Sequence, residues 1–274
     1  MLANLRKYEV WCFLGLIVVA NALFVSGIVF DVLPQRLYSY GRFALLGGLL
    51  GSVILRARGA AGIRDLLRPM LEWRRSPLWY VFALVWNPVV CLTVLAAIGL
   101  LGHGTWPQLH VKFSVISEPS TLRLLFVSSL VGEIVWISYA IRRLSQDFTP
   151  YVSALIVGGV WTCWWLPMVF YGYGVIPGLP VIPLLLNQVG IAAMCTFVYM
   201  HTKSGFLVLC LQLMANSSVL IFPVNPVDGG LTVYWIFAAC YFMASLLLFV
   251  VFGPKPLLGI GPRKDTAMLD PQSK

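Results

Sequence analysis

The sequence predicts an all-α protein, a polytopic membrane bundle of about eight transmembrane helices. Hydrophobic residues make up 59% of the 274 residues, charged residues make up 11%, and the mean hydropathy is +0.87. Soluble domains are about 45–50% apolar and about 25% charged, so this composition excludes an ordinary soluble protein. Eight apolar windows also come close to the roughly 20 residues that a spanning helix needs.

The expected spans follow one another along the chain with short polar connections. They cover residues 10–30, 38–55, 78–101, 120–141, 150–171, 180–200, 203–222 and 231–252. The first could be a signal peptide, because Arg6 and Lys7 precede it and Ala-Asn-Ala at 20–22 resembles a cleavage site. Its apolar run continues to Phe30, so we expect an uncleaved anchor.

The basic residues predict an orientation. With both termini in the cytoplasm, fifteen of the 19 basic residues face that side, and Arg36, Arg42, Lys112 and Arg123 face outward. This is the bias of the positive-inside rule. We therefore expect an integral protein of the plasma membrane, most simply of a prokaryote, in contact with membrane lipids. No nucleic-acid module is present to explain the formal charge of +9.

Four regions are expected. Residues 1–57 hold the first two spans, and residues 78–252 form a transmembrane core. Between them, residues 58–77 alternate Leu66, Leu67, Met70 and Leu71 with arginines, which predicts a basic amphipathic cytoplasmic segment at the lipid headgroups. Residues 253–274 combine glycine, proline and mixed charge, which is typical of a disordered cytoplasmic tail.

One carboxylate stands apart from the others. Nine of the ten acidic residues fall in loops, tails or at span ends, whereas Glu133 lies in the middle of the fourth span. A charge at this depth costs about 2.5–3.5 kcal/mol on insertion scales, so such residues are usually functional or locally paired. With α-helical spacing, Glu133 shares its face with Trp136, Ile137 and Ala140, and Arg142 and Arg143 lie further along at the rim.

Two neighbouring spans carry further candidates. The fifth places Trp161, Trp164 and Trp165 on one face, and the seventh places Gln212 and Asn216 at i and i+4. Tryptophan clusters often form interfacial belts, and amides often join helices. One acid and two amides on three spans could also converge on one cavity.

These stretches resemble a known family, the CAAX-protease and bacteriocin-processing (CPBP) family of intramembrane proteases, which includes the Ras-converting type. The similarity covers about residues 60–220 and is strongest over GEIVWISYAIRRL, SALIVGGVWTCWWLP and HTKSGFLVLCLQLMAN. The family motifs are E-E-x-x-x-R, a segment ending W-H-L-P, and H-x-x-x-N. The resemblance implies that the glutamates and histidines activate a water, with or without a metal, and that the asparagine helps to form an oxyanion site.

Most of those positions are replaced here. Glu133 falls on the second glutamate and Asn216 on the asparagine, but Gly132 stands at the first glutamate. The arginine and the two histidines correspond to Ile137, Trp165 and Gln212.

A catalytic zinc site uses three His, Cys or carboxylate ligands, so we expect no metal and no cofactor. His103, His110 and His201 lie in loops or at a span end, and the six cysteines show no C-x-x-C spacing.

The leading hypothesis is a catalytically degenerate protein of this fold that binds a hydrophobic ligand or a membrane partner in the former active site. The expected pocket comprises Glu133, Asn216, Gln212 and Trp165, lined by Trp161, Trp136 and Ile137. An alternative is a membrane enzyme that uses Glu133 as a general acid or base on an isoprenoid-like substrate. Residual peptidase activity through Glu133 and Asn216, a transporter, and a purely structural role of Glu133 paired with Asn216 or Gln212 stay open.

Overall fold

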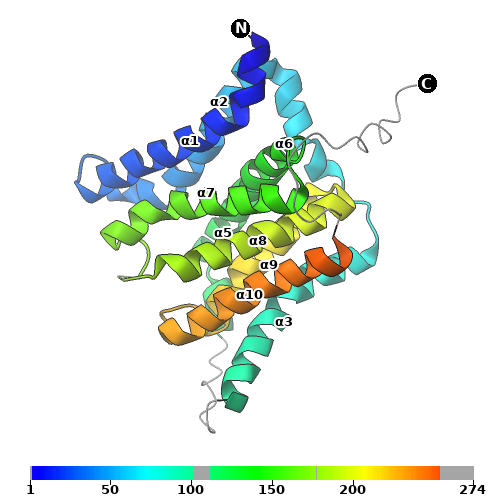
Figure 1. The fold of residues 1–274 in the computed structure, drawn as a ribbon. Helices are drawn as coiled ribbons and strands as arrows, with labels where there is room; N and C mark the ends of the chain where they lie inside the picture. The colour runs from blue at the N-terminus through cyan, green and yellow to red at the C-terminus, as the bar shows by residue number, and fades with distance from the viewer. Residues whose placement is uncertain (1, 102–111, 177, 254–274) are drawn as a thin grey trace.

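The computed structural model describes residues 2–101, 112–176 and 178–253, and this part of the chain forms helices without any strand (Figure 1). The all-α prediction is therefore confirmed. The helices, in chain order, are α1 (Leu2–Val29), η1 (Gln35–Leu37), α2 (Tyr38–Leu67), η2 (Arg68–Leu71), α3 (Pro77–Leu101), α4 (Phe113–Ser117), α5 (Pro119–Gly132), η3 (Glu133–Ile141), α6 (Arg142–Leu144), α7 (Pro150–Tyr171), α8 (Val181–Thr202), α9 (Gly205–Ile221) and α10 (Gly230–Phe252).

Seven helical segments of the described chain are long and apolar enough to cross a membrane, with α5, η3 and α6 forming one continuous span, Pro119–Leu144. The eighth expected span is α9, which has 17 residues. At about 1.5 Å per residue it measures roughly 25 Å, slightly less than the ~30 Å hydrocarbon core. This short helix packs inside the bundle against α3, α5, α8 and η3.

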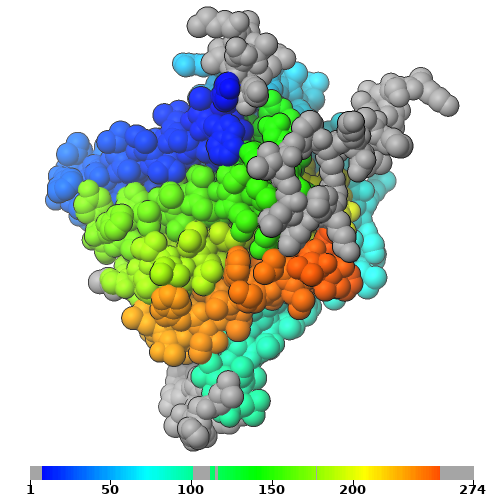
Figure 2. Space-filling model, viewed as in Figure 1, coloured from blue at the N-terminus to red at the C-terminus, as the bar shows by residue number. Residues whose placement is uncertain are grey.

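The long helices lie side by side. In Figure 1, α7, α8 and α10 run next to one another, with α1 at the side of α7 and α3 at the side of α10, in agreement with their packing contacts. Figure 2 shows α1, α7, α8 and α10 as successive bands on one face. Large apolar side chains such as Leu23 on α1 and Leu247 on α10 are exposed on these helices. Such surfaces suit lipid contact, and the chain is an integral membrane protein.

Gly59 interrupts α2. Its backbone has φ 65° and ψ −160°, a region that is essentially restricted to glycine, so the helix breaks there (Figure 1). The residues that follow are those predicted to form an amphipathic segment at the headgroups, and part of their apolar face packs on the bundle. Leu66 is buried, whereas Leu67 and Leu71 are exposed.

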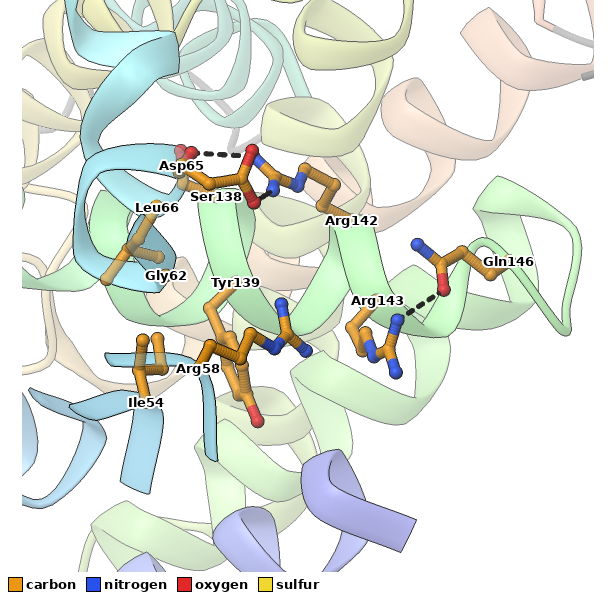
Figure 3. Close-up of a pocket in the computed structure, with 10 residues that line it drawn as sticks. All are labelled: Ile54, Arg58, Gly62, Asp65, Leu66, Ser138, Tyr139, Arg142, Arg143 and Gln146. Carbon is orange, nitrogen blue, oxygen red and sulfur yellow. Dashed lines mark hydrogen bonds and ion pairs between the residues drawn. The ribbon is translucent and has the colours of Figure 1, made fainter. Parts of the chain in front are cut away.

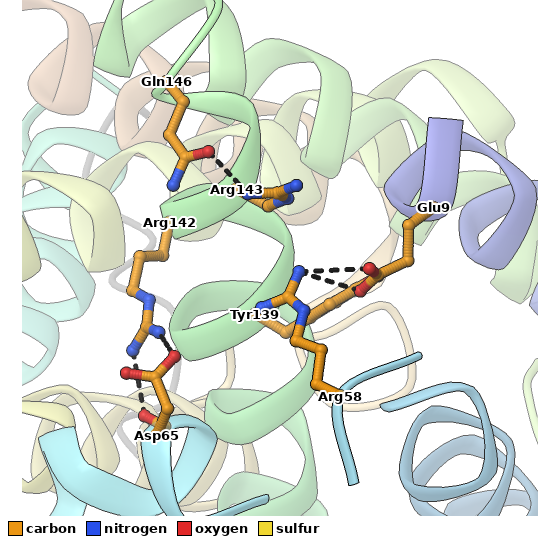
Figure 4. A network of polar contacts seen from close by, with 7 residues as sticks. All are labelled: Glu9, Arg58, Asp65, Tyr139, Arg142, Arg143 and Gln146. Carbon is orange, nitrogen blue, oxygen red and sulfur yellow. Dashed lines mark hydrogen bonds and ion pairs between the residues drawn. The ribbon is translucent and has the colours of Figure 1, made fainter. Parts of the chain in front are cut away.

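The end of the bundle near this break is tied together by ion pairs, which we call the polar end (Figure 4). Arg58 donates to both carboxylate oxygens of Glu9, at 3.0 and 3.1 Å, and the Tyr139 hydroxyl donates to the same carboxylate at 3.1 Å. These contacts join α1, α2 and η3.

Arg142 pairs with the Asp65 side chain and also donates to the Asp65 carbonyl at 3.0 Å, while Arg143 donates to Gln146 at 2.7 Å. Arg142 therefore joins this helix end to α2, while the bond from Arg143 to Gln146 is local. A cavity of about 30 Å³ lies at this end, lined by the residues drawn in Figure 3. It has room for a water or two and is too small for an organic ligand.

Candidate functional site

Glu133 is the first residue of the π-helix η3 and is completely buried. The Ser138 hydroxyl donates a 2.6 Å hydrogen bond to its Oε1 atom. Within the described part of the chain, Oε2 has no hydrogen-bond partner. The π-helix explains the first contact, because its turn brings residues i and i+5 into register. The α-helical spacing used above instead places Trp136, Ile137 and Ala140 beside Glu133.

The start of α9 packs directly on this carboxyl group. A methyl group added to Gly205 would lie 2.6 Å from Glu133 Oε1 and 3.1 Å from Met70 Sδ. The absence of a side chain at Gly205 therefore lets the acid approach the N-terminal end of α9, where the helix dipole favours negative charge. Met70, from the segment after the break in α2, also lies against the Gly205 position.

Gln212 is buried one step away. A methyl group on Gly132 would lie 2.8 Å from Gln212 Oε1, so residues 132 and 212 face each other. The thiol of Cys195 lies beside Gln212 and close to Glu133. Gln212 Nε2 is buried and has no hydrogen-bond partner among the described residues. Glu133, Cys195 and Gln212 thus lie near one another, and we call them the Glu133 cluster.

A separate cavity of about 320 Å³ opens between α2, α5, η3, α7 and α9. Four of the predicted site residues line it, namely Trp136, Trp161, Trp165 and Asn216. Trp164, on the face expected for the fifth span, lines it too. We call this space the tryptophan cavity. The Asn216 amide donates to Ser129 Oγ at 2.8 Å, so its partner is a serine rather than Glu133.

The tryptophans contact one another in defined geometries. Trp136 stacks on Trp161 with ring centroids 5.6 Å apart, and Trp164 meets Trp165 edge to face at 5.7 Å. Trp164 also packs edge to face on Trp136 at 6.4 Å. These contacts give the cavity an aromatic wall. Of the two predicted amides, Asn216 lines the cavity, and it comes from α9.

The predicted site residues are thus distributed over two adjoining places. Glu133 and Gln212 belong to the Glu133 cluster and are not among the residues that line the tryptophan cavity. Ile137 is fully buried in the core. Gly132 connects the two places, because it lines the cavity and also contacts Gln212.

Arg42 is a cavity residue that the sequence reasoning missed. It lines the tryptophan cavity, is 5% exposed, and its guanidinium carbon lies 4.0 Å from the centre of the Trp164 ring. The charge pattern placed it with the outward-facing basic residues of a span end. The available signal was Asn21 in the middle of the first span, since the Asn21 amide lies beside Arg42 and donates to the Trp164 carbonyl at 2.7 Å.

The described residues contain no group of three or more His, Cys, Asp or Glu side chains that could hold a metal ion. His201 lies outside the Glu133 cluster, with its ring nitrogens 2.8 Å from the Phe197 carbonyl and 3.2 Å from the Phe252 carbonyl. His103, His110 and nearly all of the expected disordered tail, 253–274, lie outside the described residues.

Comparison with family models and with curated proteins gives no match for this chain.

Proposed function

We propose that this membrane protein binds a hydrophobic molecule in the tryptophan cavity and that it is a catalytically degenerate relative of the CPBP proteases. The observation that carries the proposal is the cavity itself, about 320 Å³ in volume and walled by Trp136, Trp161, Trp164 and Trp165. Ligand sites are usually concave, largely apolar spaces of about 300–1,000 Å³ with a few polar groups. An apolar segment of a membrane partner is the other occupant that such a wall suits.

Two positions support the family relationship. A side chain at position 132 would meet residue 212, since a methyl group there lies 2.8 Å from Gln212 Oε1. The family pattern has a glutamate and a histidine at these positions, and such a pair must be adjacent to act on one water. Glycine and glutamine supply no base at these two positions.

The packing of Glu133 supports loss of hydrolysis. Its side chain has no exposed surface, with Ser138 hydrogen-bonded to it and Gly205 lying against it. A general base must reach the water that it deprotonates. Within the described residues, Glu133 is not part of the cavity wall, so a peptide in the cavity would not touch it.

In the same proposal the polar end faces the cytoplasm, and both termini lie on that side. The basic side chains of Arg58, Arg142 and Arg143 at this end support that orientation. A prokaryotic plasma membrane is the corresponding location.

Tryptophan quenching tests the binding proposal. Bromine quenches tryptophan fluorescence at short range, so 12-bromododecanol should produce saturable quenching of the purified protein in neutral detergent. Ser128 lines the cavity, and the phenyl ring of Ser128→Phe should obstruct it and weaken the saturable quenching. Ser120, exposed on the same helix, provides the matched control Ser120→Phe, which should bind as the unmodified protein does.

Two outcomes overturn the proposal. One is quenching that is linear and identical in all three proteins, since this reports partition into the detergent and no site. The other is cleavage of a lipidated peptide by the purified protein that is lost in Glu133→Ala, since this would show that the protein is an active protease.

A second candidate is a membrane enzyme that uses Glu133 as a general acid or base on an isoprenoid-like substrate. The observation that favours it is the buried Oε2 atom, which has no hydrogen-bond partner in the described residues. Glu133→Gln separates the candidates. The glutamine retains an oxygen for Ser138 but cannot exchange a proton, so ligand binding should survive and turnover of a substrate should not.

A further inference from the structure

Arg42 is a buried cation without a counter-ion in the described structure. It lies on the second turn of α2, and its side chain is 5% exposed. The ion pairs among the described residues involve Arg58, Arg75, Lys112 and Arg142 and leave Arg42 out. An arginine near a helix end commonly extends to water, whereas this one turns into the bundle. An ionised group in this position calls for a partner.

The surrounding residues hold the guanidinium group in place without neutralising it. Arg42 Nε donates to Asn21 Oδ1 at 3.4 Å and Nη1 donates to the Tyr38 hydroxyl at 3.3 Å. Asn21 and Tyr38 are themselves fixed, because Asn21 donates to the Trp164 carbonyl at 2.7 Å and Tyr38 to the Tyr173 carbonyl at 3.1 Å. Their oxygens therefore face Arg42.

Aromatic faces supply the remaining contacts of the cation. The guanidinium carbon lies 4.0 Å from the Trp164 ring centre and 5.1 Å from that of Trp165. Cation–π contacts attract the charge but carry no opposite charge of their own. The net positive charge of this wall is therefore unbalanced.

Three hydrogen-bond donors on this wall are also unused. Arg42 Nη2, Trp164 Nε1 and Trp165 Nε1 are buried and have no acceptor among the described residues. All three belong to side chains that line the tryptophan cavity. A buried donor without an acceptor is costly, and an oxyanion with several acceptor oxygens would satisfy such a group.

We propose that the tryptophan cavity binds an anionic amphiphile whose phosphate or carboxylate head is held by Arg42 and the indole N–H groups of Trp164 and Trp165. The apolar body of the ligand then lies along Trp136 and Trp161. This inference rests on the proposed function and names the ligand class. Arginine suits the head because its planar fork matches the oxygens of a carboxylate or a phosphate. Arg42 is the one charged residue among the described residues that line the cavity, which favours a head of low charge.

The first test compares ligands with the same tail. The probes are 12-bromododecyl phosphate and 12-bromododecanol, measured by saturable tryptophan quenching in neutral detergent. The phosphate should bind about tenfold or more tightly than the alcohol, as expected for charge-assisted hydrogen bonds. Inorganic phosphate alone should not displace it at similar concentration, because the tail contributes to binding. Displacement by inorganic phosphate at equal concentration would show that the tail does not contribute, and it would overturn the proposal that the ligand is an amphiphile.

Variants locate the head. Arg42→Gln should reduce the affinity for the phosphate probe to the affinity for the alcohol. Arg42→Lys should retain part of the preference for the phosphate probe. Arg36→Gln removes a positive charge from an exposed residue of η1 at the same end and should change nothing. An equal loss of affinity for the phosphate probe in Arg36→Gln would mean that surface charge causes the effect, and it would overturn the assignment of Arg42 to the head.

A second pair of variants covers the case in which Arg42 substitutions do not fold. Trp165→Phe keeps an aromatic ring but removes one unused donor, so it should weaken binding of the phosphate probe severalfold more than it weakens binding of the alcohol. Trp161→Phe is the matched control on the same helix and should affect both probes alike. Equal binding of the two probes in every protein would overturn the inference and leave the proposed function standing. Absence of saturable binding by either probe would overturn both.

Competition with dioctanoylphosphatidate, which carries the same phosphate monoester on a two-chain lipid, identifies the source of the ligand. Stronger competition by this lipid than by unbrominated dodecyl phosphate assigns a membrane lipid, and weaker competition assigns a single-chain metabolite. Both results support recognition of the head. Competition by neither compound at saturating concentration would contradict it.

Discussion

Ser138 donates a 2.6 Å hydrogen bond to the carboxyl group of Glu133, five residues earlier in the same span. In an α-helix these two side chains would point in different directions, but the π-helix Glu133–Ile141 aligns them. The buried acid is therefore satisfied on one oxygen by its own helix.

Ser138→Ala should destabilise the fold. The substitution removes the hydrogen bond that the described structure gives to Glu133, and leaving a buried group unpaired costs about 1–3 kcal/mol. The temperature of unfolding in detergent should fall accordingly. Ser128→Ala is the control, because its hydroxyl bonds the Leu125 carbonyl of its own helix at 3.0 Å from a less buried position. Equal effects of the two substitutions would contradict a special role for Ser138.

The elements could be predicted from the sequence because long apolar windows separated by polar turns specify spanning helices directly. The windows at 150–171 and 231–252 match α7 and α10 to within a residue. The partner of Glu133 could not be predicted in this way. Helical spacing places i+3 and i+4 beside an acid, whereas the chain changes to π geometry at residue 133, where α9 packs on the carboxyl group. The spacing of residues along a single helix does not contain that contact.

The tryptophan cavity was partly predictable. Trp161, Trp165 and Asn216 were found from their spacing on single helices, and they do line one space. Arg42 was missed because a basic residue near a span end usually marks orientation. Only its burial beneath Trp164 distinguishes it, and burial depends on the packing of α1, α2 and α7, which single-helix patterns do not contain.

Gly158 and Gly159 on α7 should respond in opposite ways to alanine. A methyl group on Gly158 would lie 2.5 Å from the Val189 Cα atom on α8, whereas one on Gly159 meets nothing within 4 Å. Small residues allow such close helix contacts in membranes. Gly158→Ala should therefore destabilise the protein by about 1–3 kcal/mol through overpacking. Gly159→Ala should be neutral or slightly stabilising because alanine is the better helix former. Thermal unfolding of the two single variants measures the difference, and equal stability would contradict the packing of α7 on α8.

The pair between Glu9 and Arg58 should matter more than the pair between Glu72 and Arg75. The side chain of Glu9 is 4% exposed, whereas that of Glu72 is 42% exposed. Removing one partner of a buried pair costs about 3–5 kcal/mol, and an exposed pair contributes about 0–1 kcal/mol. Because the side chain of Arg58 is 25% exposed, water compensates part of that cost and Glu9→Gln should fall below this range. Unfolding in denaturant should separate Glu9→Gln from Glu72→Gln, and a larger effect at Glu72 would contradict the polar end as a structural clamp.

Acid should release a contact in the loop between α9 and α10. Lys112 Nζ donates to Asp228 Oδ1 at 2.5 Å and Asn225 donates to Oδ2 at 2.9 Å. The hydrogen bond from Lys112, followed by that from Asn225, lowers the pKa of Asp228 below its ordinary value of 3.8. A carboxyl group with a lowered folded pKa stabilises the protein above the unfolded value, and this contribution disappears as the pH falls from there through the folded pKa.

Asp228→Asn should therefore unfold at a lower temperature than the unmodified protein at pH 7, and the gap should narrow as the pH falls below about 4. Because the Lys112 side chain is 44% exposed and that of Asp228 is 21% exposed, the effect at pH 7 should be modest, about 0.2–1 kcal/mol. Lys112→Ala removes the main donor, so Asp228→Asn should have a smaller effect in that background. A gap that is constant or widens on acidification would contradict the pair, because protonation of the carboxylate is what makes Asp228 resemble asparagine.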